Sequence, residues 1–112
     1  MVFKLEMNFT FVVEENNEIV GIANGTLVDK SGLSRLGWIG AHPTHQNKGI
    51  GKALLKKVIE HCRTKGWHKI TLYTTPFLIT AVNLYLKQGF VPEAYLRKEW
   101  WNVDFIKMSK WL

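Results

Sequence analysis

A polar loop followed by two closely spaced glycines stands at the start of a predicted helix. The segment runs Ala41-His-Pro-Thr-His-Gln-Asn-Lys-Gly-Ile-Gly-Lys-Ala-Leu54. The first backbone N–H groups of a helix lack internal partners, and the helix dipole adds positive potential there. Gly49 and Gly51 would let a diphosphate approach the backbone, and Lys48 and Lys52 add positive charge at the rim. The pattern indicates an anion cradle, although a plain strand-to-helix turn also fits it.

Two other phosphate-binding motifs do not fit this spacing. The stretch Gly49-Ile-Gly51 lacks the third glycine of the dinucleotide fingerprint, and no Gly-x-x-x-x-Gly-Lys-Ser/Thr sequence occurs. A nucleotide-hydrolysing loop is therefore disfavoured.

The loop and a second stretch of the sequence both resemble motifs of a known family, the GNAT family of N-acetyltransferases. Gln46-Asn-Lys-Gly49-Ile-Gly51, after Ala41-His-Pro43, resembles the family's acetyl-CoA motif Gln/Arg-x-x-Gly-x-Gly/Ala. Ala81-Val-Asn-Leu84-Tyr85-Leu-Lys-Gln-Gly89-Phe90 resembles its helix element Ala-x-x-Leu-Tyr-x-x-x-Gly-Phe. The resemblance covers about residues 10–112. It implies an enzyme that transfers the acetyl group of acetyl-CoA to a primary amine of an unidentified acceptor.

The resemblance also implies a place for the cosubstrate, acetyl-CoA. The pantetheine arm would enter between the strand that ends at residues 39–41 and the next parallel strand, and would bond free backbone groups there. The turn over residues 46–52 would hold the pyrophosphate through main-chain N–H groups. The implied cofactor-binding residues are Ile39, Ala41, Gln46, Asn47, Lys48, Gly49, Ile50, Gly51 and Lys52. No metal is expected.

One residue, Tyr85, is implied as the catalytic acid. An amine would attack the thioester carbonyl directly, a backbone N–H near Ala41 would stabilise the tetrahedral oxyanion, and Tyr85 would protonate the departing thiolate. Some relatives place a glutamate on the central strand, but residues 33–41 contain no acidic residue. The candidates for the base stay open; they are Glu14, Asp29, His42 and Glu99.

Two departures from the family pattern concern the cofactor arm and the acceptor side. Many relatives carry an asparagine three residues before the helix alanine, where this chain has Leu78. Members usually begin with a strand and one or two helices that wall the acceptor site, whereas only residues 1–8 precede the first predicted hairpin here. We therefore expect a short member with either an open acceptor cleft or a wall supplied by a partner subunit, and we predict a homodimer.

Hydrophobic patterns place these motifs on a mixed framework of strands and helices. Alternation over residues 9–28 predicts a β-hairpin that turns at residues 15–18, and a third strand ends at His42-Pro43. An amphipathic helix is predicted from Gly49 to about Gly66, because apolar residues recur there at spacings of three and four; they are Ile50, Ala53, Leu54, Val58 and Cys62.

The remaining elements complete a single predicted domain over residues 1–112. A strand at residues 70–74, a second helix stopped by Gly89, and two last strands at about 90–100 and 103–111 follow. We predict an α/β (α+β) fold with a mixed, mostly antiparallel sheet of about six strands and two main helices. The resemblance makes it similar to the acyl-CoA N-acyltransferases.

The composition excludes several classes of protein. The chain has 112 residues, 46% of them hydrophobic, which excludes an intrinsically disordered chain. No apolar run approaches the ~20 residues that cross a bilayer, and residues 1–6 do not resemble a secretory signal, so we expect a cytoplasmic protein without a membrane partner. The single cysteine, Cys62, excludes an internal disulfide and any multi-cysteine zinc site.

Charge and aromatic content leave alternatives open. The net charge of +6 suits a polyanionic partner, but no nucleic-acid-binding motif is recognised. The five tryptophans indicate core packing and a strand face, or else an aromatic ligand wall or subunit interface. We expect Trp100, Trp101 and residues 97–99 to be the first places to look for acceptor contacts. The alternative to an enzyme is a CoA-binding regulatory or interaction module with weak or no catalysis.

Overall fold

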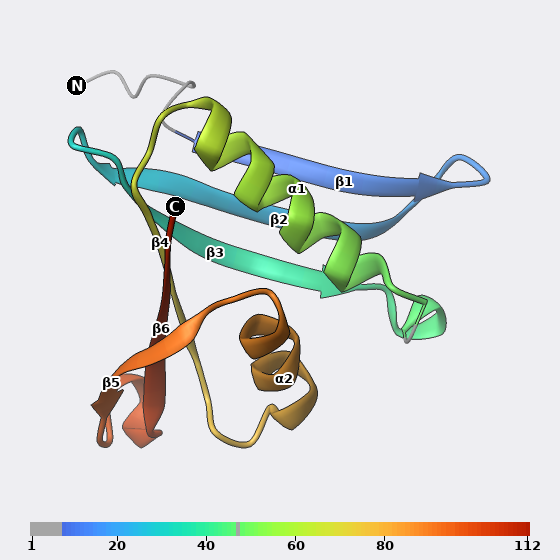
Figure 1. Ribbon diagram of the computed structural model, residues 1–112. Coiled ribbons are helices and arrows are strands. Elements are labelled where there is room, and N and C mark those ends of the chain that lie inside the picture. The colour runs from blue at the N-terminus through green and yellow to red at the C-terminus, as the bar shows by residue number, and fades with distance from the viewer. Residues whose placement is uncertain (1–7, 47) are drawn as a thin grey trace.

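The computed structural model describes residues 8–46 and 48–112, and in them one six-stranded sheet is combined with two helices (Figure 1). The strands are β1 (Asn8–Glu15), β2 (Glu18–Asp29), β3 (Leu33–Ala41), β4 (Lys69–Thr74), β5 (Val91–Leu96) and β6 (Phe105–Trp111). The helices are α1 (Ile50–Thr64) and α2 (Ile79–Lys87), and short 3₁₀ turns span Pro43–His45 and Trp100–Asn102. The predicted fold class is confirmed.

The central strands β3 and β4 separate after a short pairing, and this separation creates the site described below. The strand order is β1-β2-β3-β4-β6-β5, and β3 and β4 are the parallel pair. Their ladder joins residues 33–35 to residues 69–71 and goes no further. Figure 1 shows the two strands leaving that point in diverging directions. Beyond Arg35, the edge of β3 that faces β4 therefore carries no strand partner.

Residues with positive φ angles set the predicted turns and helix ends. Asn16 and Asn17 have φ angles of 51° and 66°, as a type I′ hairpin turn between β1 and β2 requires. Lys65 is the C-cap of α1, and Gly66 follows it with a φ of 74°, so the helix ends where the sequence predicted. Gly89, with a φ of 91°, follows the C-cap residue Gln88 and ends α2.

Helix α1 lies across β1, β2 and β3 and supplies much of the core. Its buried residues are Ile50, Leu54, Leu55, Val58, Ile59 and Cys62. The predicted stripe was wrong at Ala53, which is exposed, and it omitted Leu55 and Ile59. The apolar face is wider than a narrow stripe because three strands lie under it. Burial also raises the pKa of the Cys62 thiol, as suits an inert core residue.

The face of the sheet opposite α1 carries exposed apolar side chains. The register pairs Val12 with Ile22 and Asn24 with Trp38, so these residues share that face. Trp38 is 68% exposed. The interpretation of the tryptophans as core packing and a strand face is confirmed in part. Trp67 packs against the core, and Trp38 and Trp111 lie on strands, but all the tryptophans other than Trp67 are exposed. The homodimer stays a prediction.

Among the described residues, no helix has the length and apolar character needed to span a membrane.

The connection between the last two strands is longer than predicted. β5 ends at Leu96 and β6 begins at Phe105, whereas the sequence suggested that the first of these strands reached residue 100. Positive φ angles at Lys98, Trp101 and Asn102 break the ladder. Asp104 braces the turn, because its carboxylate accepts the Lys98 N–H and the Tyr95 hydroxyl, each at 2.8 Å.

A bulge in β5 places one carboxylate among cations. The register shift between Pro92 and Ala94 leaves Glu93 as the extra residue. Glu93 lies 2.8 Å from the Lys69 ammonium and 3.4 Å from that of Lys107, and it accepts the Ser109 hydroxyl at 2.7 Å. The hydrogen bonds from Lys69 and Ser109, with the charge of Lys107, lower the pKa of Glu93 to about 2. Glu93 thus ties β5 across β6 to β4.

Replacing Glu93 with glutamine should destabilise the fold in a pH-dependent way. Because the folded pKa of about 2 lies below the ordinary value of 4.5, the ionised carboxylate stabilises the fold fully above pH 4.5. That contribution is lost as the pH falls toward 2. Urea unfolding should therefore show a lower free energy of unfolding for Glu93→Gln at pH 7, with the difference shrinking by pH 2.5. Glu60→Gln, at an exposed helix position, is the control, and an equal loss from Glu93→Gln at both pH values would contradict the assignment.

Candidate functional site

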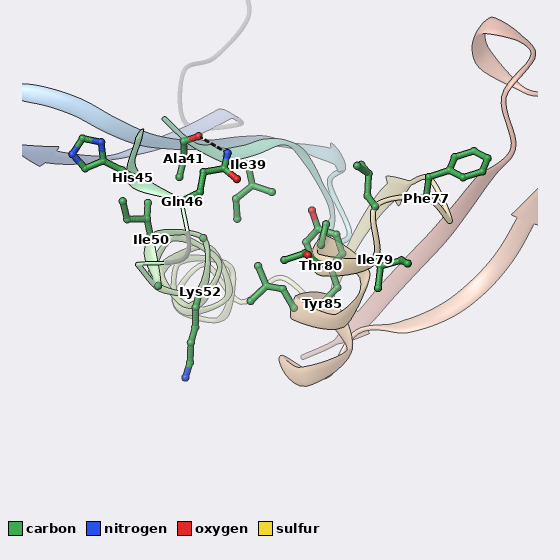
Figure 2. A pocket seen from close by; sticks show the side chains of 16 residues that line it. Ile39, Ala41, His45, Gln46, Ile50, Lys52, Phe77, Ile79, Thr80 and Tyr85 are labelled. Carbon is green, nitrogen blue, oxygen red and sulfur yellow. Dashed lines mark hydrogen bonds between the residues drawn. The ribbon is translucent and has the colours of Figure 1, made fainter. Parts of the chain in front are cut away.

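The main cavity lies where the end of β3, the start of α1 and the start of α2 come together (Figure 2). Its volume is about 630 Å³, within the range of roughly 300–1,000 Å³ that is usual for small-molecule sites. β3 contributes residues 39–41, and α2 contributes Ala81, Leu84 and Tyr85. The ladder between β3 and β4 has ended before this point, and no residue of β4 lines the cavity.

The cavity gathers most of the residues singled out from the sequence. Of the implied cofactor-binding residues, its lining includes Ile39, Ala41, Gln46, Gly49, Ile50, Gly51 and Lys52. Lys48 is exposed and is not part of the lining, and Asn47 lies outside the described residues. Tyr85, the implied catalytic acid, also lines the cavity although it comes from a different helix.

The first turn of α1 presents backbone donors to this cavity. The first hydrogen bond of the helix runs from the Ala53 N–H to the Gly49 carbonyl at 3.0 Å, so the N–H groups of residues 50–52 precede it. The N-cap, Gly49, has a φ of 77° and makes no side-chain cap, and no acidic residue lies in the first turn. The helix end therefore keeps its positive potential, and Lys52 adds a full charge beside it.

The two glycines are needed for different reasons. Gly49 adopts a left-handed conformation that L side chains rarely accept, although a Cβ placed there would meet nothing within 4 Å. Gly51 has ordinary helical geometry, and a Cβ there would lie 3.4 Å from the Leu84 side chain of α2. Side-chain atoms beyond that Cβ would enter the space between the two helices. Gly49 is required by backbone conformation, and Gly51 keeps the cavity open.

Polar contacts brace the loop between β3 and α1. The Gln46 side-chain amide donates to the Ala41 carbonyl at 3.3 Å, and both residues belong to the lining of the cavity (Figure 2). Nδ1 of His42 lies 2.8 Å from the Thr44 hydroxyl, and Nε2 of His45 lies 3.4 Å from the Glu15 carboxylate. These contacts attach the loop to both β3 and the first hairpin.

Tyr85 is the buried titratable group of the site. Its side chain is 7% exposed, and burial raises the pKa of its phenol above the usual value of 10. The centroid of its ring lies 6.0 Å from the centroid of the Phe90 ring. Within residues 8–46 and 48–112 its hydroxyl makes no side-chain hydrogen bond. The phenol therefore stays protonated through neutral pH and is free to donate to a ligand.

A second, smaller cavity of about 260 Å³ opens on the other side of the same gap. Its lining includes Trp38, which lies on the sheet face opposite α1, together with Tyr73, Thr74 and Phe105. Three residues line both cavities; they are Ile39, Leu78 and Tyr85. The two cavities therefore meet at the point where β3 and β4 separate, next to Tyr85. Such an arrangement can bring two ligands together from opposite faces of a sheet.

None of the open candidates for a base lies on the lining of either cavity. Asp29 accepts hydrogen bonds from Ser31 in the turn before β3, at the end where β3 and β4 are still paired. Glu14 and Glu99 are exposed, and His42 bonds to Thr44 within its own loop. The lining instead includes Leu78, which the sequence analysis placed near the cofactor arm, and two apolar residues that sequence reasoning missed, Phe77 and Ile79. The uninterrupted apolar run that leads into α2 and includes its first residue, Ile79, was the signal for them.

Comparison with known families and curated proteins agrees with the resemblance seen in the sequence. The model of the acetyltransferase (GNAT) family matches residues 3–90. N-acetyltransferase 8B of Rattus norvegicus is 31% identical over 84 residues, which cover 71% of this chain and 38% of that protein. The chain thus spans less than half the length of the curated relatives it matches.

Solved structures agree with the sequence matches. A GNAT family acetyltransferase from Elizabethkingia anophelis, solved with acetyl-CoA bound, has a TM-score of 0.85 at 25% identity and covers 96% of this chain and 78% of that chain. The IAA acetyltransferase from Bacillus cereus has a TM-score of 0.87 at 21% identity, covering 96% of this chain and 80% of its own, and supports the fold alone.

Proposed function

Because the chain belongs to the GNAT acetyltransferase family, we propose that it transfers the acetyl group of acetyl-CoA to a primary amine. The observation that carries the proposal is the meeting of two cavities at the gap between β3 and β4, with Tyr85 lining both. A thioester arriving from the α1 side and an amine arriving from the opposite face would meet there. We take residues 1–112 as one acetyltransferase domain, since a single sheet joins all the described strands.

The residues of the main cavity suit acetyl-CoA. The N–H groups of residues 50–52 and the Lys52 ammonium would hold the pyrophosphate, and Gly51 would let it approach the helix. The edge of β3 around Ile39 and Ala41 lacks a strand partner, so the amide groups of a pantetheine arm would bond it as an added strand does. Gln46, which bonds the Ala41 carbonyl, stands where that arm would enter.

The proposed reaction is direct transfer. Acetyl-CoA supplies the activated acyl group; the neutral amine attacks its carbonyl carbon, and the tetrahedral oxyanion collapses with loss of the CoA thiolate. A backbone N–H near Ala41 would stabilise the oxyanion, and Tyr85 would donate its proton to the thiolate. The proton lost by the attacking amine passes to solvent or to a base that lies outside the two linings.

One observation favours the alternative of a CoA-binding module without catalysis. Neither lining contains an aspartate or glutamate, so no carboxylate is placed to accept the proton of the amine. A regulatory or interaction module would bind acetyl-CoA in the same cavity but would release no CoA when amines are added.

Calorimetry and mass spectrometry together test the proposal. Titration of the folded protein with acetyl-CoA should give saturable binding, because the first turn of α1 and Lys52 offer a diphosphate site. With a panel of amines present, the enzyme should release CoA and increase the mass of an acceptor by one acetyl group. Absence of acetyl-CoA binding would overturn the proposal; binding without acetyl transfer to any primary amine would favour the non-catalytic module.

A further inference from the structure

We propose that the smaller cavity selects an acceptor amine carried on a flat apolar group, such as an arylalkylamine. This inference rests on the proposed acetyl transfer and specifies its second substrate. It depends on three features of the cavity: its aromatic walls, its lack of charge, and its small volume.

Aromatic side chains from both sides of the gap form the walls. Trp38 comes from β3, Tyr73 from β4 and Phe105 from β6. Trp100 extends the wall outward, because its ring centroid lies 5.3 Å from that of Tyr73 and 5.0 Å from that of Phe105, both edge-on. Rings in such edge-to-face sets offer apolar faces and edges to a further flat group.

Trp38 is held in place through its backbone. The register pairs Asn24 with Trp38 and Gly25 with Leu36, which leaves Gly37 as an extra residue in β3. At this bulge the Trp38 N–H donates to the Asn24 side-chain oxygen at 2.9 Å. Bulges of this kind change the direction of a side chain, and here the side chain that follows the bulge is a largely exposed indole beside the cavity.

The cavity carries no charge on its lining. The lining residues outside the aromatic set are glycine, threonine and aliphatic residues. A second ammonium or a carboxylate next to the reacting amine would lose its hydration there without gaining an ionic partner. Diamines and free amino acids are therefore poor acceptors, and an apolar group is favoured.

The same lack of charge accounts for amine reactivity without a nearby carboxylate. Desolvation disfavours the ammonium form of an amine, so an amine that enters an uncharged cavity loses its proton more readily. The volume of about 260 Å³ lies below the usual range for a complete small-molecule site, so it accommodates the amine with one ring system and leaves any larger part of the acceptor outside.

Steady-state kinetics with matched amines test the inference. With saturating acetyl-CoA, kcat/KM for phenethylamine should exceed that for ethylamine by roughly tenfold to a hundredfold, since one ring is removed from water. It should exceed kcat/KM for 1,4-diaminobutane and for phenylalanine by at least tenfold. Equal or better use of ethylamine, the diamine or the amino acid would overturn the inference. So would a preference for butyryl-CoA over acetyl-CoA with ethylamine, because the cavity would then hold the acyl chain.

Two tryptophan variants connect the preference to the cavity. Trp38→Ala should lower the ratio of kcat/KM for phenethylamine to kcat/KM for ethylamine about tenfold, because only the larger amine reaches the indole; the exposed indole makes a folding defect unexpected. Trp111→Ala is the matched control. Trp111 is 53% exposed, and in the sheet register it lies opposite Lys69, at the end of β4 that is still paired with β3. Equal effects of the two variants would overturn the assignment to Trp38.

Calorimetry on the same samples separates this inference from the proposed function. A protein that binds acetyl-CoA and acetylates other amines, or none of this panel, refutes the arylalkylamine inference alone. A protein that does not bind acetyl-CoA refutes the proposed function, and the inference falls with it. Binding of phenethylamine to the CoA-loaded protein, weakened in Trp38→Ala, gives a readout independent of turnover.

Discussion

Replacing Tyr85 with phenylalanine should lower kcat by about 10²–10⁴-fold, the usual contribution of a positioned proton donor. The phenol lines both cavities, it is nearly buried, and burial keeps its pKa above the ordinary value, so it is protonated when the thiolate leaves. Phenylalanine preserves the ring that packs near Phe90. The Kd for acetyl-CoA should therefore stay within about twofold, and the loss should appear in kcat.

A second tyrosine provides the control for this variant. Tyr95 donates to Asp104 in the turn between β5 and β6 and lines neither cavity. Tyr95→Phe should keep kcat for ethylamine within about threefold. If Tyr85→Phe retained full kcat while binding acetyl-CoA normally, the leaving thiolate would not depend on this phenol, and the proposed role of Tyr85 would be wrong.

Short-range sequence patterns predicted the turns and helix ends that depend on neighbouring residues alone. The asparagine pair at residues 16–17 favours the left-handed angles that a tight hairpin turn needs, and Gly66 ends α1 for a similar reason. Both could be read from residue type alone. The longer turn after β5 could not, because its shape depends on Asp104 accepting the Lys98 N–H from six residues away. Nothing in the short-range pattern marks that contact.

The candidate site also has one half that local sequence signals predict and another half that they do not. The phosphate-facing half follows from glycine spacing at the start of a helix, which is a local signal. The other half depends on tertiary structure: residues 77–79 enter the lining because β4 diverges from β3 and carries α2 to the edge of the gap. Likewise, the exposure of Trp38 depends on a bulge opposite Asn24 in another strand. Residue type predicted an aromatic set but gave no account of which members face a cavity.

Replacing Gly51 with valine should weaken acetyl-CoA binding by about tenfold to a hundredfold without unfolding the protein. Gly51 occupies the first turn of α1, where the proposed pyrophosphate contacts lie, and a Cβ there already touches Leu84 across the cavity at 3.4 Å. The two additional methyl groups would occupy space that the diphosphate needs, and tenfold corresponds to about 1.4 kcal/mol. Since glycine is among the poorest helix formers, valine should leave the free energy of unfolding unchanged or slightly higher.

Gly51 makes a sharper test of the proposed phosphate site than Gly49. A side chain at Gly49 would strain a backbone whose φ is 77°, so weaker binding there would combine steric blocking with a distorted loop. Gly51→Ala is the graded control: its single methyl group makes only an ordinary contact with Leu84, so it should weaken acetyl-CoA binding less than Gly51→Val does. Calorimetry and thermal unfolding on the three proteins separate affinity from stability. If a folded Gly51→Val protein bound acetyl-CoA as tightly as the parent, the start of α1 would not be where the diphosphate binds, because valine cannot leave that approach open.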